Sequence, residues 1–136
     1  MAKTVLIVED EPTNMKLCRD LLRVSGFKTL EATDGKQAIE LARKYRPALI
    51  LMDVQMPVMD GLAATEVLKA DPSTGDIPVL ALTSYAMKGD EERVLKAGCD
   101  AYMTKPIDTQ EFLRVVRTML CGGTPENGTN AESNGG

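Results

Sequence analysis

Residues 49–52 read Leu-Ile-Leu-Met, and Asp53 follows directly. A short run that is apolar throughout is typical of a strand buried on both faces, because helices cover both sides of a parallel sheet. Similar short stretches of apolar or β-branched residues recur along the chain, at 5–8, 29–30, 79–82 and 101–103. The pattern therefore predicts a parallel sheet of five strands.

The segments between these stretches show the spacing of amphipathic helices. Apolar residues recur at i, i+3, i+4 and i+7 within residues 38–45, and residues 112–120 repeat this spacing. Pro12 is expected in a first helical turn, and Gly26 and Gly98 are expected where helices end. Strands that alternate with helices predict an α/β fold, a flavodoxin-like (βα)5 sandwich of three layers with the sheet in the middle.

The composition excludes several classes of function. The 136 residues contain no histidine, which excludes a histidine phosphoacceptor, a histidine general base, hydrolytic triads built on histidine and every histidine-containing metal site. The formal net charge of −4 argues against binding to nucleic acid, because phosphate neutralisation needs clustered Lys and Arg. The chemistry is therefore expected to rest on carboxylates, lysine, hydroxyls or cysteine.

The cysteines and the N-terminus predict a cytoplasmic protein. Cys18, Cys99 and Cys121 are odd in number and show no C-x-x-C spacing, so neither a disulfide framework nor a zinc cluster is expected. Cys18 falls among helical apolar positions and is interpreted as a core thiol. The apolar run at residues 5–8 is too short for a signal peptide or a membrane span.

Reactive side chains follow four of the five predicted strands. Glu9 and Asp10 follow the first strand, Asp53 follows the third, Thr83 ends the fourth and Lys105 follows the fifth. In parallel α/β sheets, ligands bind beyond the carboxyl ends of the strands. The flavodoxin-like strand order 2-1-3-4-5 makes the second strand an edge, so we expect these five side chains to converge on one patch.

Three carboxylates in one patch require a cation. Carboxylates about 4 Å apart repel by roughly 4 kcal/mol at an effective dielectric constant of 20. Oxygen ligands without Cys or His favour Mg²⁺, which prefers one or two carboxylates, retained waters and phosphate oxygens. The sequence therefore predicts a magnesium site at this end of the sheet.

The segments that carry these residues resemble the signature blocks of response regulator receiver domains. They are Val-Leu-Ile-Val-Glu-Asp-Glu (5–11), Leu-Met-Asp-Val-Gln-Met-Pro-Val-Met-Asp-Gly (51–61), Ala-Leu-Thr-Ser (81–84) and Tyr-Met-Thr-Lys-Pro (102–106). Each block alone is a weak signal, whereas all four in this order and at these spacings are specific. The resemblance covers about residues 3–121, and residues 84–92 are similar to single-domain regulators of the cell-cycle type.

The resemblance implies a metal-dependent phosphoacceptor site. Asp53 would accept a phosphoryl group from a histidine kinase or a histidine phosphotransfer protein. Asp10 and Asp53 would bind Mg²⁺ directly together with the backbone carbonyl of Gln55, and Glu9 would act through water. Such a domain catalyses only its own phosphorylation and dephosphorylation and is otherwise no enzyme.

The resemblance also implies how phosphorylation becomes a signal. Thr83 would form a hydrogen bond to a phosphoryl oxygen, Lys105 would pair with another, and Tyr102 would turn inward as an aromatic switch. A plain core or edge aromatic is the alternative for Tyr102. The surface of the fourth helix, fifth strand and fifth helix would then engage a downstream protein. We expect a monomer, with a dimer formed on phosphorylation as the open alternative.

Two other functions fit the same topology. A Mg²⁺-dependent phosphohydrolase with an aspartyl-phosphate intermediate usually carries Asp-x-Asp-x-Thr after the first strand, where this chain has Glu-Asp-Glu-Pro at 9–12. A flavin-binding electron carrier is disfavoured because the chain has no Trp, few aromatic residues and no hydroxyl-rich loop after the first strand.

The chain is expected to divide into one domain and a tail. Residues 1–121 would form the receiver domain. Residues 122–136 hold five of the eleven glycines and a single apolar side chain, so they cannot repay the entropy cost of ordering. We therefore predict a flexible tail over 122–136.

Overall fold

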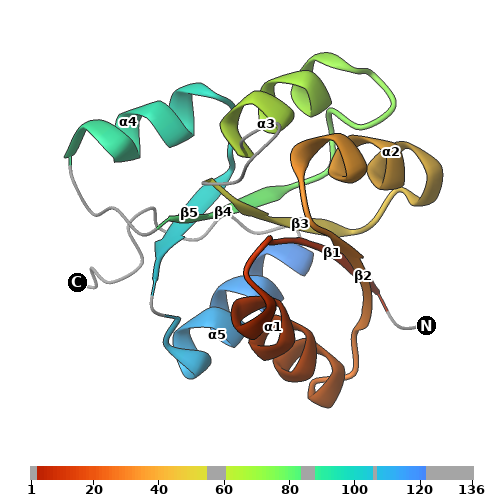
Figure 1. The fold of residues 1–136 in the computed structure, drawn as a ribbon, viewed down its shortest axis with the longest axis vertical. Helices are drawn as coiled ribbons and strands as arrows, with labels where there is room; N and C mark the ends of the chain where they lie inside the picture. The colour runs from red at the N-terminus through yellow and green to blue at the C-terminus, as the bar shows by residue number, and fades with distance from the viewer. Residues whose placement is uncertain (1–2, 55–60, 84–87, 106, 122–136) are drawn as a thin grey trace.

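The computed structural model describes residues 3–54, 61–83, 88–105 and 107–121. The predicted tail, residues 122–136, lies outside these residues. Within the described part, the five strands form a parallel sheet in the order β2-β1-β3-β4-β5 (Figure 1). The strands are β1 (Thr4–Val8), β2 (Lys28–Ala32), β3 (Leu49–Asp53), β4 (Val79–Thr83) and β5 (Ala101–Thr104). The predicted strand order is confirmed.

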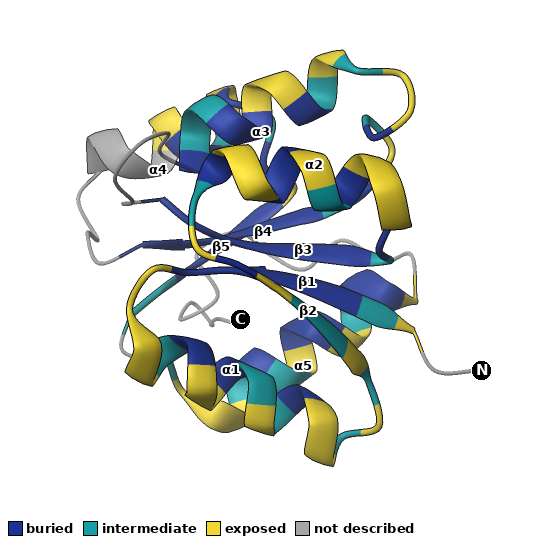
Figure 2. Cartoon of the chain, turned by 45° about the vertical axis from the view of Figure 1, so that its right-hand side comes forward, coloured by how far each residue is buried: buried dark blue, intermediate teal, exposed yellow. Residues whose placement is uncertain are grey.

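Helices cover both faces of this sheet. They are α1 (Pro12–Val24), α2 (Gly35–Tyr45), α3 (Gly61–Ala70), α4 (Lys88–Lys96) and α5 (Thr109–Leu120). Helices α1 and α5 lie on one face, and α2, α3 and α4 lie on the other (Figure 2). The three-layer α/β sandwich is therefore confirmed. Every helix in the described part of the chain falls short of the length and apolarity needed to cross a bilayer.

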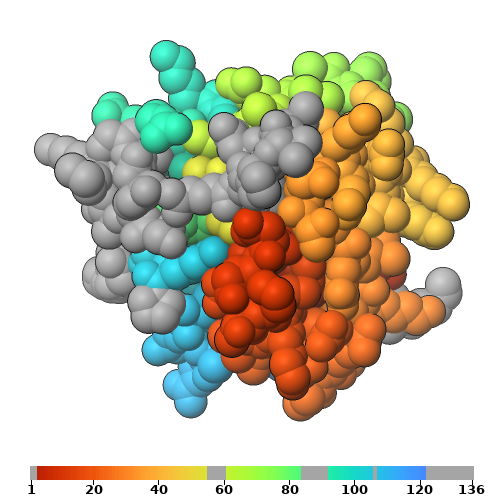
Figure 3. Space-filling model, in the orientation of Figure 1, coloured from red at the N-terminus to blue at the C-terminus, as the bar shows by residue number. Residues whose placement is uncertain are grey.

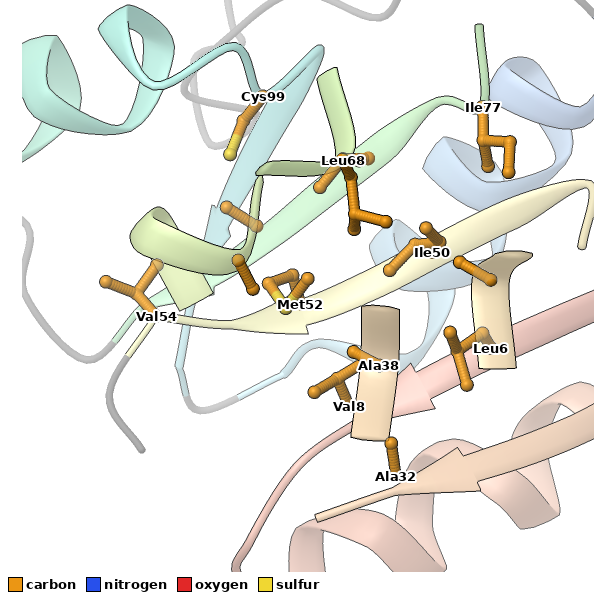
Figure 4. Close-up of a cluster of buried hydrophobic side chains, with 14 of the residues drawn as sticks. Leu6, Val8, Ala32, Ala38, Ile50, Met52, Val54, Leu68, Ile77 and Cys99 are labelled. Carbon is orange, nitrogen blue, oxygen red and sulfur yellow. The ribbon is translucent and has the colours of Figure 1, made fainter. Parts of the chain in front are cut away.

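Alternate residues of each central strand feed two separate cores. Leu6 and Val8 of β1 pack with α2 and α3 in one core, part of which is drawn in Figure 4, while Val5 and Ile7 pack with α1 and α5 in the other. Both sets are fully removed from solvent. This two-sided burial explains why the central strands read as continuous apolar runs.

Capping residues set the ends of the helices. Pro12 is the first residue of α1, where its missing N–H costs no hydrogen bond, and the Glu11 carboxylate accepts from the Asn14 backbone N–H at 2.9 Å. Gly26 and Gly98 follow α1 and α4 with φ of 93° and 107°, a left-handed conformation that favours glycine. The expected positions of Pro12 and both glycines are confirmed.

Arg46 and Lys69 form ion pairs beside the amino-terminal ends of β4 and β5. Arg46, which ends α2 with φ of 46°, binds the carboxylate of Asp76 through both oxygens at 3.1 Å just before β4 begins. Lys69 of α3 donates to the Asp100 carboxylate at 2.9 Å and to the Ile77 carbonyl at 2.8 Å. Asp100 also accepts from the backbone N–H of Val79 at 2.8 Å. These contacts connect α2 and α3 to the residues just before β4 and β5.

The three thiols differ in exposure, and this predicts their reactivity. Cys18 and Cys99 are buried and Cys121 is exposed, which confirms Cys18 as a core thiol. Burial raises the pKa of Cys18 to about 12 and that of Cys99 to about 11. Because the thiolate is the nucleophile, we expect iodoacetamide to modify Cys121 alone in the folded protein.

Peptide mass spectrometry before and after addition of guanidinium measures this prediction. Denaturant is expected to make all three thiols reactive. Rapid native modification of Cys18 would contradict the packing of α1 against the sheet.

Candidate functional site

The residues singled out by the sequence gather at the carboxyl edge of the sheet. Glu9 follows β1, Asp53 ends β3, Thr83 ends β4 and Lys105 follows β5. The register aligns these ends, since Asp53 lies opposite Leu82 and Thr83 lies opposite Thr104. In the space-filling view, the red-orange start of the chain lies directly beside the blue segment near its end (Figure 3). The topology therefore brings distant segments together, as predicted.

Three carboxylates form a cluster at this edge. Carboxylate oxygens of Glu9, Asp10 and Asp53 all lie within 4.8 Å of one another. Glu9 is 1% exposed and Asp53 is 3% exposed, whereas Asp10 is open to solvent. Two buried carboxylates beside an exposed third form an oxygen-only donor set that is accessible from one side. This donor set fits a hard divalent cation such as Mg²⁺.

Lys105 bridges the two buried carboxylates. Its Nζ lies 3.0 Å from Oε1 of Glu9 and 3.3 Å from Oδ1 of Asp53. Its backbone N–H donates to the carbonyl of Thr83 at 2.8 Å, which ties the ends of β4 and β5 together. The sequence placed Lys105 in the patch but gave no sign that Glu9 is its partner.

Burial and neighbouring charges shift the pKa values of Glu9 and Lys105. The pKa of the Glu9 carboxyl is raised from its ordinary 4.5 to about 7, mainly by burial and then by the hydrogen bond and negative charge of Asp53, while Lys105 opposes the shift. Burial alone would lower the pKa of Lys105, but its contacts with Glu9 and Asp53 outweigh burial and raise it. The second Glu9 oxygen accepts from the Glu11 backbone N–H at 3.2 Å. Lys105 is therefore held as a cation.

Two of the other three predicted site residues lie in the described part of the chain. Thr83 is 2% exposed at the end of β4. Tyr102 is 8% exposed within the core between the sheet and helices α2, α3 and α4, an inward position compatible with a core aromatic and with a switch. Gln55 lies outside the described residues.

The backbone of Gly61 lies very close to that of Asp53, which the sequence did not reveal. The sequence predicts that Gly61 shapes a sharp turn after Asp53, and the structure places it as the first residue of α3. A Cβ on Gly61 would stand 2.1 Å from the Asp53 carbonyl oxygen and 2.8 Å from Cγ of Met52. The Gly61 N–H donates to the Val54 carbonyl at 3.1 Å. Only glycine allows α3 to begin this close to the end of β3.

Two carboxylates near the end of β2 have ordinary structural roles. Glu31, beside the end of β2, pairs with Arg19 at 3.1 Å on the surface. Asp34 caps α2 by accepting from the Gln37 backbone N–H at 2.9 Å. The edge strand β2 thus contributes no side chain to the carboxylate cluster.

Curated relatives match the chain along nearly their whole length. A polar-differentiation response regulator DivK from Brucella anthropi is 49% identical over 120 residues, which cover 88% of this chain and 98% of the relative. The protein of the same name from Brucella ovis is 48% identical over the same shares of both chains.

Solved structures with the same fold are also receiver domains. The receiver domain of a signal transduction histidine kinase from Syntrophus aciditrophicus superposes with a TM-score of 0.84 at 36% identity, covering 89% of this chain and 92% of that one. The receiver domain of the sensor histidine kinase PA1611 from Pseudomonas aeruginosa, which holds a magnesium ion in its active-site cleft, gives 0.83 at 35% identity, covering 89% and 99%. The model of the response regulator receiver domain family matches residues 5–117, and the chain therefore belongs to this family.

Proposed function

We propose that this receiver domain accepts a phosphoryl group on a carboxylate oxygen of Asp53 in the presence of Mg²⁺. The observation that carries the proposal is the position of Asp53, a buried carboxylate 3.3 Å from the Lys105 ammonium and within a cluster of two further carboxylates. The donor is a phosphohistidine of a histidine kinase or a histidine phosphotransfer protein. The chain has no histidine of its own, so the donor must belong to a partner.

The residues around Asp53 have distinct roles in this transfer. An Asp53 oxygen attacks the phosphorus in line, the new O–P bond forms as the N–P bond of the donor breaks, and the histidine leaves with the electron pair. Asp10 and Asp53 would hold Mg²⁺ directly, with the Gln55 carbonyl as a further ligand and Glu9 acting through water. When bound, the metal neutralises negative charge on the transferred oxygens.

Lys105 and Thr83 convert the new charge into a change of shape. A phosphoryl group on Asp53 presents oxygens that attract the Lys105 ammonium away from Glu9 and the Thr83 hydroxyl inward. Both residues anchor segments that lead to α4 and α5. The surface formed by α4, β5 and α5 then favours binding of a downstream protein. Tyr102 is the buried part of the switch.

Several findings support this proposal. The relatives are named as response regulators, and the Pseudomonas neighbour carries magnesium in its cleft.

The functional unit would be residues 1–121, acting as a monomer that signals through protein contacts rather than nucleic acid. The free thiols of the chain support a reducing cytoplasm as its compartment.

A phosphohydrolase is the second candidate function, and the phosphotransfer test below distinguishes it from the first. Its usual nucleophile would follow β1, where Asp10 is exposed and Pro12 already begins α1. The test is transfer from a purified ³²P-labelled histidine kinase to this chain. We expect a stoichiometric, hydroxylamine-sensitive label on Asp53. Sustained hydrolysis of small phosphomonoesters without a label would instead favour the phosphohydrolase.

Asp10 offers a direct test of the metal site. Asp10→Asn removes one charge from the carboxylate cluster, so the metal-free variant is expected to melt at a higher temperature than the wild type. Its stabilisation by MgCl₂ is expected to fall, because a ligand present at 100 times its Kd stabilises by about 2.7 kcal/mol and the lost carboxylate weakens binding by roughly tenfold or more. Melting curves with and without MgCl₂ measure both effects.

Glu40→Gln is the matched control for Asp10→Asn. Glu40 is an exposed carboxylate on α2, away from the cluster. This variant is expected to respond to MgCl₂ like the wild type. An equal Mg²⁺ response in Asp10→Asn and wild type would contradict the role given to Asp10.

A further inference from the structure

Two buried hydrogen bonds in series connect the turn before β5 to the first turn of α3. The hydroxyl of Thr65 donates to the carbonyl of Gly61 at 2.7 Å, and the Cys99 thiol donates to the Thr65 Oγ1 at 3.8 Å. Thr65 is 0% exposed and Cys99 is 6% exposed. Cys99 points from the start of β5 into the core beneath α3 (Figure 4).

These hydrogen bonds lead to Gly61, whose backbone lies against that of Asp53. Gly61, which accepts the Thr65 hydroxyl, stands so close to Asp53 that a Cβ would lie 2.1 Å from its carbonyl oxygen. Gly61 also donates to the carbonyl of Val54, whose N–H in turn donates to the Leu82 carbonyl of β4 at 3.0 Å. A shift of the first turn of α3 would therefore shift the end of β3.

We infer that Thr65 is a positioning residue for Asp53, acting through Gly61, with Cys99 as its outer support. The inference rests on the proposed function, because it concerns the same carboxylate. A hydroxyl that bonds to the carbonyl four residues earlier bends a helix slightly toward that bond. Here the bond holds Gly61 against the Asp53 carbonyl.

The adjoining turn supports Thr65 from the side of α4. Gly98, with φ of 107°, packs so closely on α3 that a Cβ would lie 3.0 Å from Cγ of Lys69. This contact holds the turn that carries Cys99 against α3. The α4–β5 turn and the Asp53 backbone are therefore joined through one helix.

Removal of the hydroxyl tests the inference. Thr65→Val keeps the shape of the side chain and removes the bond to Gly61. The initial rate of Asp53 phosphorylation by acetyl phosphate at saturating Mg²⁺ is expected to fall roughly tenfold, because small misplacements of a reacting group are costly. Thr65→Ser keeps the hydroxyl and is expected to restore the rate to within about twofold of wild type, although it loses a buried methyl group.

The chain provides a matched control in Thr74. Thr74 is 1% exposed, and its hydroxyl donates to the Leu68 carbonyl at 2.7 Å, the same kind of bond at the opposite end of α3. Thr74→Val is expected to lower the melting temperature without changing the phosphorylation rate. Rate and melting temperature are measured on the same samples of the full chain.

The outcomes separate the inference from the proposed function. If the wild type takes no label on Asp53, the proposed function fails. If the wild type is labelled and Thr65→Val keeps the wild-type rate, the positioning role is overturned and the proposed function stands. Should Thr65→Val fail to fold, Thr65→Ala against Thr65→Ser makes the same comparison, because both lose the methyl group and only Ala loses the hydroxyl.

Discussion

Asp53→Asn is expected to abolish phosphorylation of the chain by acetyl phosphate and Mg²⁺. The amide is nearly the same size as the carboxylate but lacks the anionic oxygen that attacks phosphorus. Lys105 keeps its contact with Glu9 at 3.0 Å, so we expect the variant to fold. Intact mass spectrometry measures the label, and circular dichroism checks the fold.

Asp76→Asn is the control for this experiment. Asp76 is an exposed carboxylate just before β4, at the ends of the strands opposite to the site, and it pairs with Arg46. Its variant is expected to take the label like the wild type. A label that persists on Asp53→Asn at the wild-type rate would exclude Asp53 as the acceptor.

Gly61→Ala is expected to impair both stability and phosphorylation. Its Cβ would overlap the Asp53 carbonyl, so either α3 or the end of β3 must move. Overpacking of this kind costs about 1–3 kcal/mol of unfolding free energy. A displacement of Asp53 by about 1 Å would slow phosphorylation by about a hundredfold. Urea unfolding and the initial labelling rate measure the two effects.

Gly26→Ala distinguishes a local from a general effect. Gly26 has φ of 93° and no atom within 4 Å of an added Cβ, so its variant is strained without a clash. The strain is expected to cost about 1–2 kcal/mol while the labelling rate stays unchanged. Equal labelling of Gly61→Ala and wild type would show that the contact with Asp53 is not required.

The fold was predictable because its signals are local. The central strands are apolar throughout, and the positions of Pro12, Gly26 and Gly98 follow from backbone geometry alone. The edge strand β2 was the weakest prediction, since only 29–30 stood out from a strand that spans Lys28–Ala32. Its exposed Lys28 and Glu31 interrupt the apolar pattern.

The site was predictable only to the level of its location. Topology places the ends of parallel strands together, so the convergence of Glu9, Asp53 and Lys105 follows from strand order. The pairing of Lys105 with Glu9 depends on how the Lys105 side chain reaches from the end of β5 past β4 and β3 to the residue after β1, and the sequence carries no signal for it. Thr65 and Cys99 were missed for the same reason, because 34 residues separate the two ends of their hydrogen bond.

The ion pairs of Arg46 and Lys69 lie on the side of the sheet opposite to the proposed phosphorylation site. Both lie on the amino-terminal side, where β4 and β5 begin, while the carboxylates and Lys105 lie on the opposite side. These two ion pairs hold the residues just before β4 and β5. Under the proposed phosphorylation, small displacements of Thr83 and Lys105 would leave the contacts at the starts of β4 and β5 in place, so we expect the strands to keep their register.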